Sequence, residues 1–147
     1  MLYFTFIYPQ LLYGVEVYAN ACTCHIEKLI VLNNKLLRIA QNCPVRKRTF
    51  TVDLYKQYST LPLPSLHDYN VLRFVHKCFY NSLAMPNVFN DYFQLNIAIH
   101  AYGTRSVDRL HLHTVNSSVG LKCIKCKDYC LLWNRLSKVI TDIRCSV

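Results

Sequence analysis

Apolar side chains recur at helical spacing in two long segments of the chain. The first segment covers residues 26–41 and the second covers residues 66–83. The periodic positions in the first segment are Ile26, Leu29, Ile30, Asn33, Leu36, Leu37 and Ala40. Those in the second segment are Leu66, Tyr69, Leu72, Val75, Phe79 and Leu83. Spacings of three and four residues predict an amphipathic helix in each segment. Pro44 is expected to end the first helix, and Ser65 to be the N-cap of the second.

The rest of the pattern predicts shorter elements. Residues 3–18 are mostly aromatic and aliphatic, so periodicity fits a buried strand and a helix equally well. The segment 94–121 is polar and irregular, but alternation over 109–115 predicts a strand or an extended arm within it. Helices are expected at 53–58 and 131–143, and a single apolar turn at 88–93.

These elements predict a mainly α protein. We expect a small helical bundle, followed by an irregular or extended segment and a C-terminal helix. Its 147 residues are expected to form one incomplete domain in three parts, at 1–45, 46–93 and 94–147.

The charge balance adds information that periodicity does not give, because it indicates a negatively charged partner. Lys and Arg number 17 against 8 Asp and Glu, a formal net charge of +9. Such a surplus favours nucleic acid or an anionic membrane surface. The apolar run 1–15 is too short to span a bilayer and has no basic residue before it. We therefore expect no membrane span, an intracellular location in cytoplasm or nucleus, and reduced cysteines.

Two basic stretches are candidate nucleic-acid contacts. One is the cluster Arg46, Lys47 and Arg48, and the other is the stretch His100–Arg105. In the second stretch an aromatic ring that can stack on a base lies beside donors for phosphate. The alternative for both is a solvated basic loop, with Tyr102 packed inward. The candidate residues are Arg46, Lys47, Arg48, His100, Tyr102, Thr104 and Arg105.

Metal binding and catalysis have weaker support. Cys123, Cys126 and Cys130 supply three thiolates, but the second short-spaced pair of a common zinc site is missing. Candidates for a fourth ligand are His111, His113 and Cys145. No two acidic residues lie closer than 11 positions apart, and glycine-rich phosphate loops are absent. The sequence therefore predicts no catalytic residue and no cofactor in this chain.

Four stretches, taken in order, resemble the reverse transcriptases of non-LTR, LINE-type retrotransposons, the Jockey-like group among them. They are IYPQLLYGVEVY (7–18), CHIEKLIVLNNKLLRIAQNCP (24–44), HAYGTR (100–105) and Gly120 followed by LWNRL (132–136). The last resembles a closing Gly … Leu-Trp-Asn-x-Leu-Pro pattern, and the first resembles the segment after the polymerase palm. The resemblance covers about 7 to 140, and its specificity lies in the order of the motifs.

The chain departs from the family pattern at several positions. Val17-Tyr18-Ala19 stands where an aliphatic residue, Trp and Gly are usual, and Ser137 replaces the closing Pro. Cys126 and Cys130 fall where the family often has polar residues or Gly-Pro. Trp133-Asn134 is therefore the informative part of this region, and the cysteines are incidental to it.

The resemblance implies the thumb and following region of an RNA-directed DNA polymerase. Family enzymes hold Mg²⁺ with palm aspartates, and this chain has no Asp-Asp pair. We therefore expect a thumb-like fragment that contacts the primer–template backbone without sequence specificity. It would work with the upstream polymerase domains and have no activity alone.

Two other functions remain open at this stage. The first is a small basic helical module that binds a protein partner through leucine and tyrosine faces. The second is a zinc-binding module built on Cys123, Cys126 and Cys130.

Overall fold

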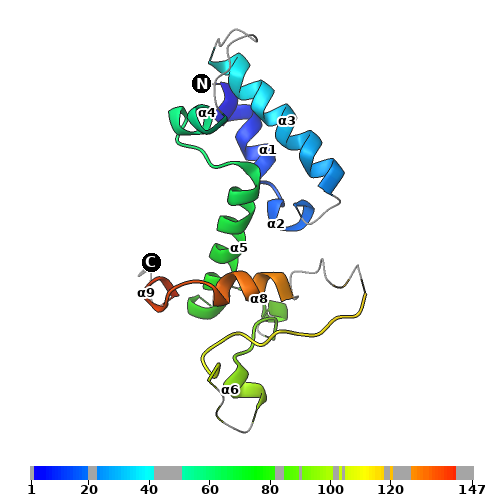
Figure 1. Ribbon diagram of the computed structural model, residues 1–147, viewed down its shortest axis with the longest axis vertical. Helices are drawn as coiled ribbons and strands as arrows, with labels where there is room; N and C mark the ends of the chain where they lie inside the picture. Colours follow the sequence, from blue (N-terminus) through cyan, green and yellow to red (C-terminus); the bar gives the residue numbers. More distant parts are fainter. Residues whose placement is uncertain are drawn as a thin grey trace. The chain divides into compact units, whose positions relative to one another are not determined.

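The computed structural model describes residues 2–19, 23–41, 51–81, 85–89, 91–100, 103, 105–117, 120 and 127–141. It is mainly helical (Figure 1), which confirms the predicted fold class. The chain divides into two compact units, Met1–His67 and Asp68–Val147. In the described residues no helix is both long enough and apolar enough to cross a membrane.

Five helical elements belong to the first unit, and a sixth begins there. They are η1 (Tyr3–Ile7), α1 (Tyr8–Leu12), α2 (Val15–Tyr18), α3 (Thr23–Ala40), α4 (Thr51–Gln57) and α5 (Leu63–Tyr80). Most of α5 belongs to the second unit. The remaining described elements of that unit are η3 (Asn87–Phe89), α6 (Asn96–Ile99), α8 (Lys127–Asn134) and α9 (Lys138–Thr141).

The ambiguous segment 3–18 is helical. A π-helical turn, η1, leads directly into α1, and Pro9 is the second residue of α1. Gly14 has a φ of +67°, a left-handed conformation that separates α1 from α2. The Tyr18 hydroxyl then donates a hydrogen bond to the Leu11 carbonyl across this break.

Both long helices form, with shifted boundaries. Helix α3 begins three residues before the predicted start, and α5 runs from Leu63 to Tyr80 instead of 66–83. The predicted N-cap at Ser65 is wrong. The Leu66 N–H already donates to the Pro62 carbonyl at 2.9 Å, and Pro64 fits the first turn of the helix. Pro44 lies outside the described residues.

The C-terminal region differs more from the expectation. A single helix over 131–143 was expected, but α8 ends at Asn134 and α9 begins at Lys138. The segment 109–115, expected as a strand or an extended arm, is an extended arm outside any helix or named strand. In the described residues it makes one isolated antiparallel bridge, between Leu95 and Leu110. The pattern therefore located extended backbone but supplied no second strand for a ladder.

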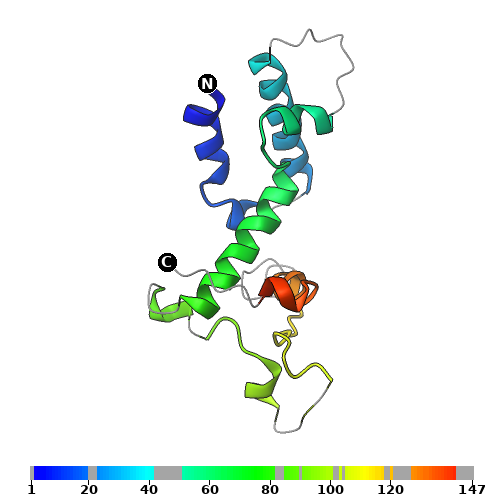
Figure 2. The ribbon, with the colours of Figure 1, turned by 90° about the vertical axis from the view of Figure 1, so that its left-hand side faces the viewer.

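The first unit is held by a core with a polar centre. Tyr3, Leu37 and Tyr55 are buried together, and Figure 2 shows α1 alongside α3. Packed against these three are Phe4, Ile7, Tyr8 and Tyr58. Asn33 is only 3% exposed, and its side-chain amide joins the two buried tyrosines.

The hydrogen bonds of this centre form a continuous chain. The Tyr3 hydroxyl donates to Asn33 Oδ1 at 2.9 Å, and Asn33 Nδ2 donates to the Tyr55 hydroxyl oxygen at 3.2 Å. The Tyr55 hydroxyl in turn donates to Asn34 Oδ1 at 2.6 Å. A buried polar side chain is tolerated when its partners are satisfied, so this network fixes how η1, α3 and α4 meet.

The network predicts a loss of stability at high pH. Burial raises the pKa of Tyr3 from 10.0 to about 12, and burial also raises the pKa of Tyr55. A raised folded-state pKa stabilises the fold fully below about pH 10, and this contribution is lost as pH rises to about 12. Urea unfolding at a series of pH values should therefore show a falling free energy of unfolding across that window.

Tyr3→Phe should make this dependence shallower, because it removes the titrating hydroxyl. Tyr13→Phe is the matched control, since Tyr13 is 84% exposed and lies outside the network. Equal pH dependence in the two variants would contradict the assignment.

Candidate nucleic-acid interface

The core of the second unit brings α8 onto the second half of α5. Its buried residues come from α5, from α8, from the bend before Leu95 and from the extended segment 109–115. They are Val71, Val75, Phe93, Leu110, Tyr129 and Cys130. Partly buried neighbours complete the core: Phe74, Cys78, Phe79, Tyr92, Leu95, Leu112, Leu132 and Trp133. Two helices and the extended segment are therefore fixed to one another without a sheet.

The side chain of Asn134 makes the hydrogen bonds to Leu110 that a neighbouring β-strand would otherwise make. The bridge to Leu95 uses hydrogen bonds on one edge of Leu110, namely His111 N–H to the Gln94 carbonyl at 2.8 Å and Asn96 N–H to the Arg109 carbonyl at 2.9 Å. On the opposite edge, the Leu110 N–H donates to Asn134 Oδ1 at 2.9 Å, and Asn134 Nδ2 donates to the Leu110 carbonyl at 3.1 Å. One side-chain amide thus satisfies both backbone groups of a buried residue.

Trp133, the residue before this amide, is held by aromatic packing. Its ring stacks on Phe79 with centroids 5.8 Å apart and planes 23° apart. On α5, His76 lies 6.3 Å from the same indole and 4.7 Å from the ring of Tyr80. The Tyr80 hydroxyl donates to the Thr141 carbonyl at 2.6 Å, which ties α5 to the end of α9.

These contacts leave a groove between α5 and the α8–α9 segment. Its volume is about 510 Å³, within the range of roughly 300–1,000 Å³ that holds small ligands. Its lining is Tyr69, Leu72, Arg73, His76, Lys77, Tyr80, Asn81, Trp133, Leu136 and Ile140. We call this the α5–α8 groove.

The groove combines aromatic rings with positive charge. Tyr69, Arg73 and Lys77 lie at i, i+4 and i+8 on α5, so they share one face of the helix, and all three are exposed. The described residues that line the groove include no carboxylate. Proteins that bind single-stranded nucleic acids combine rings that stack on bases with cations that bind phosphate.

A second cavity adjoins the groove. It has a volume of about 320 Å³ and shares Tyr80, Trp133 and Leu136 with the groove. Its remaining lining residues include Asp108 and Arg109. The carboxylate makes this second cavity less suited to an anion than the α5–α8 groove.

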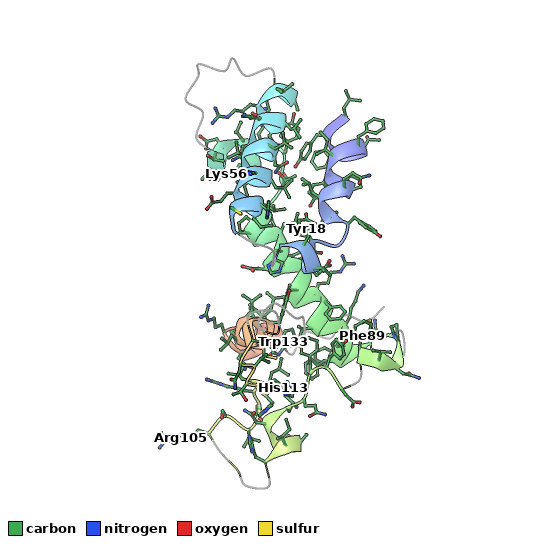
Figure 3. All side chains as sticks on the ribbon, turned by 90° about the vertical axis from the view of Figure 1, so that its right-hand side faces the viewer. Tyr18, Lys56, Phe89, Arg105, His113 and Trp133 are labelled. Carbon is green, nitrogen blue, oxygen red and sulfur yellow. The ribbon has the colours of Figure 1, made fainter. Side chains whose placement is uncertain are left out.

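The structure describes only part of the predicted nucleic-acid site. Arg46, Lys47, Arg48, Tyr102 and Thr104 lie outside the described residues. His100 is half-buried, with its ring 5.5 Å from that of His111, and Arg105 is exposed in a turn. Figure 3 shows Arg105 apart from Trp133, so the structure does not bring this arginine to the groove.

The candidate zinc ligands are also only partly described. Cys130 is 1% exposed and lies in the core, whereas Cys123, Cys126 and Cys145 lie outside the described residues. The His111 and His113 rings pack edge to face, 5.0 Å apart. Over the described part of the chain, no three His, Cys, Asp or Glu side chains form a group that could hold a metal ion. The zinc site stays a prediction.

Sequence reasoning missed the groove, although part of its signal was present. It placed Tyr69 on the apolar stripe of α5, which is wrong, because Tyr69 is 53% exposed. The spacing of Tyr69, Arg73 and Lys77 was readable as one helix face. No local pattern indicated that Trp133, more than fifty positions later, would face them.

Comparisons of the chain with protein-family models, with curated proteins and with solved structures give no match. The case for a function therefore depends on the residues themselves and on the geometry above.

The Asn134 contact predicts a large effect of a small substitution. Asn134→Ala leaves the buried N–H and carbonyl of Leu110 without their partner, so we expect the free energy of unfolding to fall by about 2–4 kcal/mol. Urea unfolding measures the loss, and hydrogen exchange at the Leu110 amide should become faster.

Asn134→Asp offers an intermediate case, because a carboxylate still accepts from the Leu110 N–H but cannot donate to its carbonyl. Asn116→Ala is the matched control at an exposed asparagine. Unchanged protection of the Leu110 amide in Asn134→Ala would rule out the proposed pairing.

Proposed function

We propose that this chain is a nucleic-acid-binding, thumb-like piece of a non-LTR retrotransposon reverse transcriptase. In this proposal it contacts the backbone of the primer–template without reading its sequence. The metal-binding aspartates and the Mg²⁺ they hold belong to other parts of the parent polymerase. The chain alone would bind nucleic acid and not copy it.

The observation that carries the proposal is the basic, aromatic face of α5. Arg73 and Lys77 are exposed one helical turn apart, and no carboxylate shares the groove with them in the described residues. The net charge of +9 extends this local surplus to the whole chain. Backbone binding requires cations and polar groups on a firm support, and a helix packed into a core provides that support.

The ordered motif series adds separate support for the parent family. Its closing element contains Trp133 and Asn134, and both have specific partners in the second unit. The stretch His100–Arg105 contributes a half-buried histidine and an exposed arginine to the same unit. Arg46, Lys47 and Arg48 remain candidates for backbone contacts.

Salt dependence is the first test of this function. Binding of a fluorescently labelled RNA–DNA hybrid should weaken linearly in log K against log salt concentration, with a slope of about −0.9 per phosphate contact. The doubly substituted Arg73→Gln/Lys77→Gln protein should lose about one unit of slope per side chain. Anisotropy titrations at several salt concentrations measure both quantities.

Lys28→Gln/Lys35→Gln is the matched control, since it removes the same charge from exposed positions of α3. A hybrid affinity that is absent, or that does not depend on salt, would reject nucleic-acid binding as the function. An equal loss of slope in both double variants would show that binding depends on the net charge of the protein and not on the exposed cations of α5.

A protein-interaction function is the second candidate, and one observation favours it. The first unit exposes many large apolar side chains. They are Leu2, Phe6, Tyr13, Val17, Val31, Leu32 and Ile39. Exposed apolar surface of this kind marks a contact site when it is contiguous. Self-association or partner binding that persists at high salt, without affinity for the hybrid, would favour this candidate.

A further inference from the structure

We infer that the α5–α8 groove holds an unpaired nucleobase of a single nucleic-acid strand. The base would stack on the ring face formed by Tyr69, Tyr80 and Trp133. Arg73 and Lys77 would hold the flanking phosphates. This inference deepens the proposed function and rests on it, because it adds a preference for unpaired strand to backbone binding.

The first argument is the aromatic content of the groove. Tyr69 is 53% exposed and Tyr80 39% exposed, while His76 and Trp133 are partly exposed beside them. Tyr69 and Tyr80 are not among the residues that form this core or pack against it, so the core does not require their rings. Every base has a π-face, so such rings bind bases without distinguishing their sequence.

The second argument is that the rings of Trp133 and Tyr80 are already held in place. Phe79 fixes one face of the Trp133 indole, and the hydrogen bond to the Thr141 carbonyl fixes the Tyr80 ring. His76 supports the Tyr80 ring at 4.7 Å. A surface that is ordered before binding loses little conformational entropy when a ligand arrives.

The third argument is charge complementarity, which selects the occupant. Arg73 and Lys77 are about 6 Å apart along the α5 axis, similar to the spacing of successive phosphates along a strand. An acidic amphipathic peptide would also complement the charge. However, rings with polar edges (Tyr69, His76, Tyr80 and Trp133) outnumber the aliphatic side chains of the lining (Leu72, Leu136 and Ile140), and this composition favours a flat ring over a leucine or phenylalanine anchor.

The fourth argument concerns base pairing. In a duplex both faces of each internal base are covered by its neighbours, so the rings of the groove can reach only a base that has left the stack. The groove volume of about 510 Å³ accommodates a base of this kind. Duplex would contact only the cations at the edge.

Trp133 is the single tryptophan of the chain, so its fluorescence reports directly on the groove. Titration with a short oligodeoxythymidylate should quench this fluorescence. Inorganic polyphosphate, which has phosphates and no bases, should bind without quenching. The matching blunt duplex should also bind with little quenching.

Substitution separates stacking from charge. Tyr69→Ala should weaken oligodeoxythymidylate binding by roughly 5- to 150-fold, the range for loss of one base–aromatic stack, and leave polyphosphate binding unchanged. Tyr13→Ala is the matched control, because it removes an 84% exposed tyrosine of the first unit. Circular dichroism of each variant verifies that it is folded.

The outcomes distinguish the inference from the function on which it rests. Salt-dependent binding to hybrid and single strand with no tryptophan quenching, or an equal effect of Tyr69→Ala and Tyr13→Ala, would overturn the inference alone. Absence of binding to every nucleic acid would overturn both. Quenching by an acidic leucine-rich peptide but not by the oligonucleotide would assign the groove to a protein partner.

Discussion

The pairing of the Asn134 amide with the Leu110 backbone is the contact on which the second unit depends. A lone extended segment between helices has two polar edges, and the bridge to Leu95 satisfies only one of them. The side chain of Asn134 satisfies the other, so Leu110 can be buried at the centre of the core. The same contact fixes the end of α8, and with it the position of Trp133 beside α5.

The first unit also depends on an asparagine side chain to fix how its elements meet. Short helices bury little apolar area each, and their packing angles are poorly specified by apolar contact alone. Asn33 connects a tyrosine of η1 to a tyrosine of α4 through its own amide. Hydrogen bonds have directional requirements, so these contacts select one arrangement of the elements. In each unit an asparagine side chain, buried in the first and half-buried in the second, thus supplies specificity that short elements lack.

The sequence predicted the elements that depend on interactions within one segment, and it missed those that depend on contacts between distant residues. Helices α3 and α5 were predictable, since each depends on periodicity within one segment. The start of α5 was not, because the Leu66 N–H already donates to the Pro62 carbonyl, so the helix begins at Leu63, before the expected cap at Ser65. The division after Asn134 was also missed, because its side chain is used on Leu110, twenty-four positions away.

The candidate site shows the same limit. Trp133 and Asn134 stood out in the sequence. Trp133 packs against the core and Asn134 pairs with Leu110, so the requirements of folding are enough to explain both residues. The side chains of Tyr69, Arg73 and Lys77 extend away from that core and are exposed on one face. Folding does not require an aromatic ring and two cations there, and an exposed tyrosine on a helix has no propensity advantage over alanine. The case for nucleic-acid binding therefore depends on these three residues more than on the motif that drew attention to the region.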